Sequence, residues 1–96
     1  MTRRLLLQPR AESDLRSAFE WYERRQRGLG REFLATVGRR LDEVQAFPEA
    51  HPIVYRNIRR AVVSRFPYVI FYIVRPATIA VLAILHHARN PAHWPG

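Results

Sequence analysis

The residues of this chain best suited to chemistry lie in its last third, where apolar segments open into a short polar tail. This tail carries His86, His87, Arg89 and Trp94. A histidine can exchange a proton near neutral pH, and an arginine fork can bind a phosphate or a carboxylate. The tail is therefore suited to acid–base work or to gripping a charged partner. For His86 and His87 the simpler interpretation is a hydrogen-bonded strand end.

Three further arginines, Arg59, Arg60 and Arg65, lie on or beside one predicted strand. All 16 basic residues of the chain are arginine, and the net charge is +8. Such a charge attracts polyanions or an acidic protein, and guanidinium forks suit phosphate and carboxylate groups. No lysine is present to act as a base or nucleophile. The plainer alternatives are edge-strand protection for Arg59 and Arg60 and biased codon composition for the missing lysine.

No metal site and no cofactor are expected. The chain has no cysteine, which excludes disulfides and thiolate sites and is typical of a cytoplasmic protein. His86 and His87 are adjacent and would face opposite sides of a strand, while His51 and His93 have no carboxylate at a matching spacing. No stretch reaches the ~18 apolar residues of a membrane span, and the N-terminal apolar run is shorter than the ~7–15 residues of a signal core.

The N-terminal half predicts a strand followed by two helices, within one domain that spans residues 1–96. Arg3–Gln8 is the predicted strand, and Pro9 suits the first turn of a helix. Apolar residues at helical spacing define the first helix: Ala11, Leu15, Ala18, Phe19 and Tyr22. A second set, Phe33, Val37, Leu41 and Val44, defines the next helix, which ends at Phe47-Pro48. The short link containing Gly28 and Gly30 predicts an antiparallel helical hairpin.

The C-terminal half predicts a three-stranded antiparallel meander after a loop from Pro48 to Asn57. The strands are Ile58–Phe66, Tyr68–Val74 and Thr78–His86, joined by links too short for a parallel crossover. The fold class is therefore α+β, an antiparallel sheet with the helices packed on one of its faces. The last two strands are apolar on both alternating faces, so the second face also needs cover. That cover must come from the tail, from another copy of the chain or from a partner.

This order of elements, with its motifs, resembles the ParE/RelE superfamily of toxins from type II toxin–antitoxin systems. The resemblance runs from about Leu5 to Trp94 and is closest to the ParE-like branch. The motifs that carry it are Ala11-x-x-Asp14-Leu15-x-x-Ala18-x-x-Trp21-Tyr22, Gly28-Leu29-Gly30 before Phe33, Phe47-Pro48 with Pro52, Phe66-Pro67-Tyr68 with Tyr72, and His86-His87-x-Arg89-x-Pro91-x-x-Trp94. The resemblance implies a toxin neutralised by a cognate antitoxin that covers the sheet face, in a hetero-oligomer.

Two activities occur in this superfamily. RelE-like toxins cut messenger RNA on the ribosome, and ParE-like toxins inhibit DNA gyrase without being nucleases. An endonuclease here would use Arg65, His87 and Arg89. However, RelE-like toxins often use lysines and a C-terminal tyrosine, whereas this chain has no lysine and has Trp94 as its nearest aromatic residue.

The sequence therefore favours a toxin that binds its target, with DNA gyrase as the expected target and no catalytic residue assigned. The residues expected to contact the target or the antitoxin are Arg59, Arg60, Arg65, His87, Arg89, Trp94 and Trp21. The alternative is the RelE-like RNA endonuclease. A third possibility, a non-toxic basic nucleic-acid-binding module, would need a continuous arginine stripe, whereas the arginines are spread over all segments.

Overall fold

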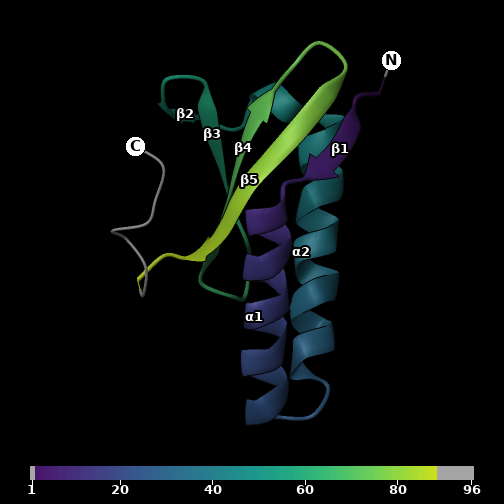
Figure 1. Cartoon of the computed structure of the whole chain (residues 1–96), viewed down its shortest axis with the longest axis vertical. Helices are drawn as coiled ribbons and strands as arrows, with labels where there is room; N and C mark the ends of the chain where they lie inside the picture. The colour runs from purple at the N-terminus through teal and green to yellow at the C-terminus, as the bar shows by residue number, and fades with distance from the viewer. Residues whose placement is uncertain (1, 89–96) are drawn as a thin grey trace.

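In the computed structural model, which describes residues 2–88, a helical hairpin covers one face of a five-stranded sheet (Figure 1). The elements are β1 (Arg4–Leu7), α1 (Pro9–Arg25), α2 (Leu29–Ala46), the 3₁₀ helix η1 (Pro48–Ala50), β2 (Ile53–Tyr55), β3 (Ile58–Val62), β4 (Tyr68–Val74) and β5 (Thr78–His86). The predicted α+β fold is confirmed. No helix within the described residues is long and apolar enough to cross a membrane.

The sheet has the strand order β1-β5-β4-β3-β2. Strands β3, β4 and β5 form the predicted antiparallel meander. The sheet as a whole is mixed, because β1 pairs in parallel with β5, with Leu5 opposite Ile79. The expectation of a fully antiparallel sheet was therefore wrong. The helical hairpin and the meander separate β1 from β5 in sequence, and this long connection permits parallel neighbours.

The segment predicted as a loop, Pro48 to Asn57, contains η1 and the edge strand β2. Strand β2 pairs with β3 across the two-residue link Arg56-Asn57, where Arg56 has a φ of 52°. Such links usually carry Asn-Gly or Asp-Gly, so an arginine at the positive-φ position concealed the hairpin. Strand β3 is also shorter than predicted. It ends at Val62, and Arg65 beyond it has a φ of 70°.

The turn between α1 and α2 is held by a carboxylate. Glu23 accepts the backbone N–H groups of Gly28 at 3.0 Å and Gly30 at 2.9 Å. These hydrogen bonds, that of Gly28 foremost, lower the pKa of Glu23. Gly28 has a φ of 90°, which favours glycine. A Cβ on Gly30 would come within 2.7 Å of the Phe19 carbonyl oxygen, so this glycine allows the close approach of the two helices.

The main core lies between the helical hairpin and the sheet. Its aromatic centre consists of Tyr22, Phe33, Phe66 and Tyr68, whose ring centroids lie 5.0–6.1 Å apart in the tilted and edge-to-face arrangements that aromatic pairs prefer. A smaller apolar cluster of strand residues, to which Ile58 adds a partly buried side chain, consists of Val69, Phe71, Ala83 and Leu85. On β4, Val69 and Phe71 alternate with the core residues Tyr68 and Ile70, so the cluster lies on the opposite face of the sheet. The prediction that both faces of the sheet are apolar is confirmed.

Candidate functional site

The described site residues are spread over β3, the ends of the sheet and α1. Arg89 and Trp94 lie outside the described residues, as does His93. Trp21 lies on α1, partly buried against the main core, with its ring edge-on to Tyr22 at 5.0 Å. The Arg25 guanidinium stacks over the Trp21 ring at 4.0 Å. Trp21 thus has a packing role on the helical hairpin, and its role in binding stays a prediction.

Arg59 anchors η1 and the start of β2 to the sheet. Its Nη1 donates to the His51 carbonyl at 2.7 Å and to the Glu49 carbonyl at 3.3 Å. Arg59 lies opposite Tyr72 in the β3–β4 ladder. The Tyr72 hydroxyl donates to the Pro48 carbonyl at 2.6 Å. Arg59 and Tyr72 therefore bind neighbouring backbone carbonyls of one connecting segment, which gives Arg59 a structural role.

Two pKa values in this region are displaced. Burial raises the pKa of Tyr72 to about 12, despite the opposing charges of Arg59 and Arg40. Burial also lowers the pKa of His51, aided by Arg40 and Arg59 and opposed by Glu43. The Tyr72 side chain is fully buried and its proton is committed to Pro48, so it cannot reach a substrate. We interpret His51, Arg59 and Tyr72 as a structural polar cluster.

Sequence reasoning did not identify this polar cluster, although one signal was available. The meander prediction fixes β3 and β4 as antiparallel neighbours, and the observed register places Arg59 opposite Tyr72. A buried tyrosine usually requires a hydrogen-bond partner for its hydroxyl. The carbonyl of Pro48, in the segment predicted as a loop, is that partner.

Arg60 lies on the other face of β3, next in sequence to Arg59. Ala61 on β3 belongs to the main core, whereas Ile58 packs against the smaller cluster, so Arg60 shares the face of Ile58 and Val62. The Arg60 Nε is buried and has no hydrogen-bond acceptor in the described part of the chain. A buried donor without an acceptor costs free energy. This nitrogen is closed to solvent, so only the rest of the partly exposed Arg60 side chain can contact a partner.

Arg65 and His87 lie at the same end of the sheet. The backbone N–H of His87 donates to the Pro67 carbonyl at 2.9 Å, which ties the end of β5 to the β3–β4 link that contains Arg65. The Arg65 guanidinium lies 3.7 Å from Glu32 on α2, and both side chains are exposed, so this ion pair is weak. His86 accepts the Ala88 N–H on Nδ1 at 3.1 Å and contacts the Tyr68 ring, as a hydrogen-bonded strand end would.

Within residues 2–88, no group of three or more histidine or acidic side chains is arranged to hold a metal ion. The described site therefore consists of cations and apolar surface. It can bind carboxylate or phosphate groups and cover apolar side chains.

The comparisons with known proteins identify the family. The family model described as ParE toxin of type II toxin-antitoxin system, parDE, matches residues 5–91. This chain belongs to the ParE toxin family. The resemblance to the ParE side of the superfamily is confirmed.

A solved structure with the fold of this ParE-family chain is titled "Chromosomal ParDE TA system from P. aeruginosa". Its matching chain is 17% identical, and the match covers 88% of this chain and 96% of that chain with a TM-score of 0.64. At this identity the likeness concerns the fold, and it confirms the ParE-like arrangement described above. Comparison with curated protein sequences gives no significant match.

Proposed function

We propose that this ParE-family toxin acts by binding and inhibiting DNA gyrase, and that a cognate antitoxin neutralises it. The observation that carries the proposal is the family match over residues 5–91. The resemblance of the sequence to the ParE-like branch supplies the target. In this proposal residues 1–96 form one toxin domain that acts in the cytoplasm as part of a toxin–antitoxin hetero-oligomer.

The residues available for catalysis support binding over RNA cleavage. Cleavage by a 2′-hydroxyl needs a base, a cation to stabilise the phosphorane and an acid for the leaving oxygen. The chain has no lysine. Tyr72, a potential acid, is buried with its proton bound to the Pro48 carbonyl.

The face of the sheet that carries Arg60 supports an acidic, partly apolar partner. Arg60 is partly exposed and lies beside the exposed Val62, while the apolar cluster on the same face is already buried. A carboxylate placed there would pair with the exposed part of the guanidinium, and an apolar side chain beside it would cover Val62. We propose that the antitoxin supplies this segment and that the arginines outside its footprint contact the target.

The experiment is co-expression of the chain with the small acidic protein encoded beside it. We expect a stable complex with a raised melting temperature, because a ligand that binds only the folded state stabilises it. Arg60→Gln should weaken the complex, whereas Arg16→Gln, which removes the same charge from an exposed position on α1, should not. A chain whose solubility and melting temperature do not respond to the adjacent gene product would contradict antitoxin binding.

The second candidate is a ribosome-dependent RNA endonuclease. The observation that favours it is the position of Arg65 and His87 at one end of the sheet, where the His87 backbone N–H donates to the carbonyl of Pro67, two residues after Arg65. Purified chain that cleaves ribosome-bound messenger RNA would establish this activity.

A further inference from the structure

A polar pocket of about 350 Å³ lies between α2 and the end of β3. Thr36, Arg39, Arg40 and Glu43 of α2 form one wall, and residues 62–64 form the other. None of these residues belongs to the set expected to contact the target or the antitoxin. The pocket therefore needs its own explanation.

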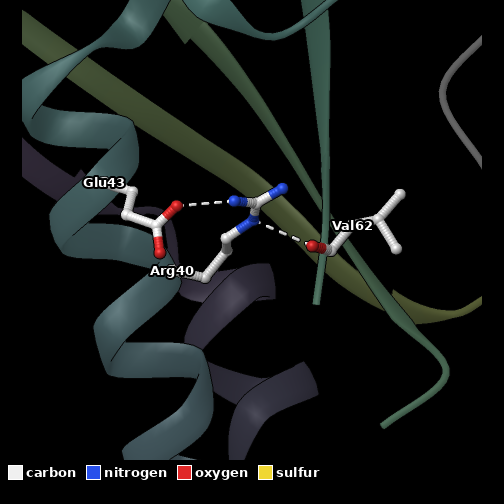
Figure 2. A network of polar contacts seen from close by, with 3 residues as sticks. All are labelled: Arg40, Glu43 and Val62. Atoms are coloured by element: carbon white, nitrogen blue, oxygen red, sulfur yellow. Dashed lines mark hydrogen bonds and ion pairs between the residues drawn. The ribbon is translucent and has the colours of Figure 1, made fainter. Parts of the chain in front are cut away.

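The Arg40 guanidinium bridges the two walls (Figure 2). Its Nε donates to the Val62 carbonyl at 2.8 Å, and its Nη1 pairs with the Glu43 carboxylate at 2.6 Å. The remaining nitrogen, Nη2, points away from Glu43 and has no acceptor among the described residues. Arg40 is thus held in one orientation with one set of donors unused. Nearby, Arg39 donates to the Thr36 hydroxyl at 3.2 Å, which holds a second guanidinium in the pocket wall.

The Val62 carbonyl belongs to an open stretch of the sheet edge. The Val63 N–H bonds to Tyr68 on β4, whereas the Arg60 N–H bonds outward to the Pro52 carbonyl. Backbone groups alternate in direction along a strand, so those of Val62 also face outward. Strand β2 pairs with β3 only at Ile58 and Arg59. At Val62 the guanidinium of Arg40 therefore occupies the place where a neighbouring strand would bind.

We propose that this pocket binds a glutamate or aspartate side chain of an extended peptide that runs along the outer edge of β3 at Val62. The carboxylate would accept hydrogen bonds from Arg39 and from the unused Nη2 of Arg40, in the charge-assisted geometry that guanidinium groups favour. Because the Arg40 guanidinium takes the Val62 carbonyl, the peptide backbone would pair with this edge through the outward Val62 N–H. The Val62 side chain, 52% exposed, offers an apolar contact beside the carboxylate.

The pocket favours a peptide over a nucleic acid. Its cations are grouped around one position between the two walls, and Glu43 lies beside them, whereas a nucleic-acid backbone is usually bound by a series of cations along a groove. The source of the peptide rests on the proposed function, since a neutralising acidic partner is the natural donor.

The test measures peptide binding by the purified full-length chain, independently of toxicity. The probe is a fluorescein-labelled pentapeptide of alternating valine and glutamate, and its counterpart carries glutamine in place of glutamate. We expect the glutamate peptide alone to bind. Arg39→Gln and Arg40→Gln should each weaken binding roughly tenfold or more, the effect of losing a charge-assisted hydrogen bond. The matched control Arg31→Gln, which removes the same charge from an exposed position earlier in α2, should change the affinity less than about twofold.

Several results would overturn the proposal. These are no binding of the glutamate peptide, equal binding of the glutamine peptide, or equal weakening by all three arginine variants, which would indicate general charge attraction. Tighter binding of a single-stranded RNA oligonucleotide with the same dependence on Arg39 and Arg40 would assign the pocket to phosphate. If circular dichroism shows that the Arg40→Gln variant is unfolded, the test depends on the Arg39→Gln variant, because Arg39 is exposed. Because the assay needs no gyrase and no antitoxin, its failure is distinct from a failure of the proposed function.

Discussion

The carboxylate of Asp14 on α1 accepts the backbone N–H of Ile84 on β5 at 3.0 Å. Strand β1 pairs with β5 only as far as Val81, so Ile84 lies on the part of that strand beyond β1. At the opposite side of the sheet, Arg40 on α2 donates to Val62 in a similar way. The helical hairpin thus supplies side-chain partners to both sides of the sheet as well as covering one face.

Asp14→Ala should lower the free energy of unfolding by about 1–3 kcal/mol, because it leaves the Ile84 N–H without its acceptor. Asp14→Asn keeps an acceptor and should cost less. Urea denaturation of the three proteins at neutral pH measures the difference. An Ala variant as stable as the wild type would show that water replaces the carboxylate without loss.

The stability of the wild type relative to the Asp14→Asn variant should also depend on pH. Burial raises the pKa of Asp14 above its ordinary 3.8, outweighing the hydrogen bond from Ile84 and the charge of Arg10. The folded state therefore binds the proton more tightly than the unfolded chain. The unfolding free energy of the wild type, relative to the Asn variant, should fall as pH rises from 3.8 through the folded pKa. A relative rise over this window would contradict the assignment of burial as the main cause.

Gly30→Ala should destabilise the chain by about 1–3 kcal/mol, the usual cost of forcing atoms into a packed site. Its Cβ would lie 2.7 Å from the Phe19 carbonyl oxygen and 2.9 Å from Glu23 Oε1, and the backbone oxygen cannot move easily. Gly38→Ala is the matched control on α2, because nothing lies within 4 Å of the added Cβ. It should stabilise the helix by about 0.5–1 kcal/mol. Thermal denaturation of both variants tests this contrast. Equal shifts of the two melting temperatures would contradict it.

Tyr72→Phe should cost about 1 kcal/mol, because it removes the hydrogen bond to the Pro48 carbonyl. The pKa of Tyr72 is raised to about 12 from an ordinary value of 10.0. The stability that this group provides is complete below pH 10 and is lost as pH rises through 12. The wild type should therefore lose its advantage over the Phe variant across this window. If the difference in unfolding free energy between the wild type and the Phe variant did not change over this pH window, the pKa of Tyr72 would be the same in the folded and unfolded chain.

Much of the fold follows from the sequence, because the periodicity of helices and strands and the residues that mark turns are local signals. The strands Tyr68–Val74 and Thr78–His86 have the predicted bounds, and the helical hairpin is where the spacing of Phe33, Val37 and Leu41 placed it. The parallel pairing of β1 with β5 is not a local property of either strand. Strand β2 was missed for two reasons. Its three residues are all exposed, so they show no alternation of buried and exposed positions, and the turn that follows has Arg56 where a glycine is usual.

The candidate site was less predictable than the fold, because it depends on which way long arginine side chains turn. Periodicity places Arg59 and Arg60 on opposite faces of a strand. It does not indicate that Arg59 binds the Glu49 and His51 carbonyls, or that the Nε of Arg60 finds no acceptor among residues 2–88. The pocket around Arg40 combines α2 with the end of β3, 22 positions away along the chain. No spacing rule connects two such segments before the helix is packed on the sheet.

Replacing His87 and Arg89 separately with alanine distinguishes a binding toxin from a nuclease. For a binding toxin, His87→Ala should have a small effect, and Arg89→Ala should cost ~1–3 kcal/mol of target affinity if this residue anchors the contact. A nuclease would instead lose ~10²–10⁴ in cleavage rate with either change, at nearly constant affinity. Titration of the target and single-turnover cleavage assays measure the two quantities.

The most direct test of the central claim is a supercoiling assay with purified chain, DNA gyrase and relaxed plasmid, run beside a cleavage assay with ribosome-bound messenger RNA. Our account predicts that the chain stops supercoiling at a stoichiometric ratio to gyrase, that the adjacent acidic protein restores it, and that the messenger RNA stays intact. Messenger RNA cleaved at catalytic amounts of the chain, with supercoiling unaffected, would contradict the account and establish the endonuclease.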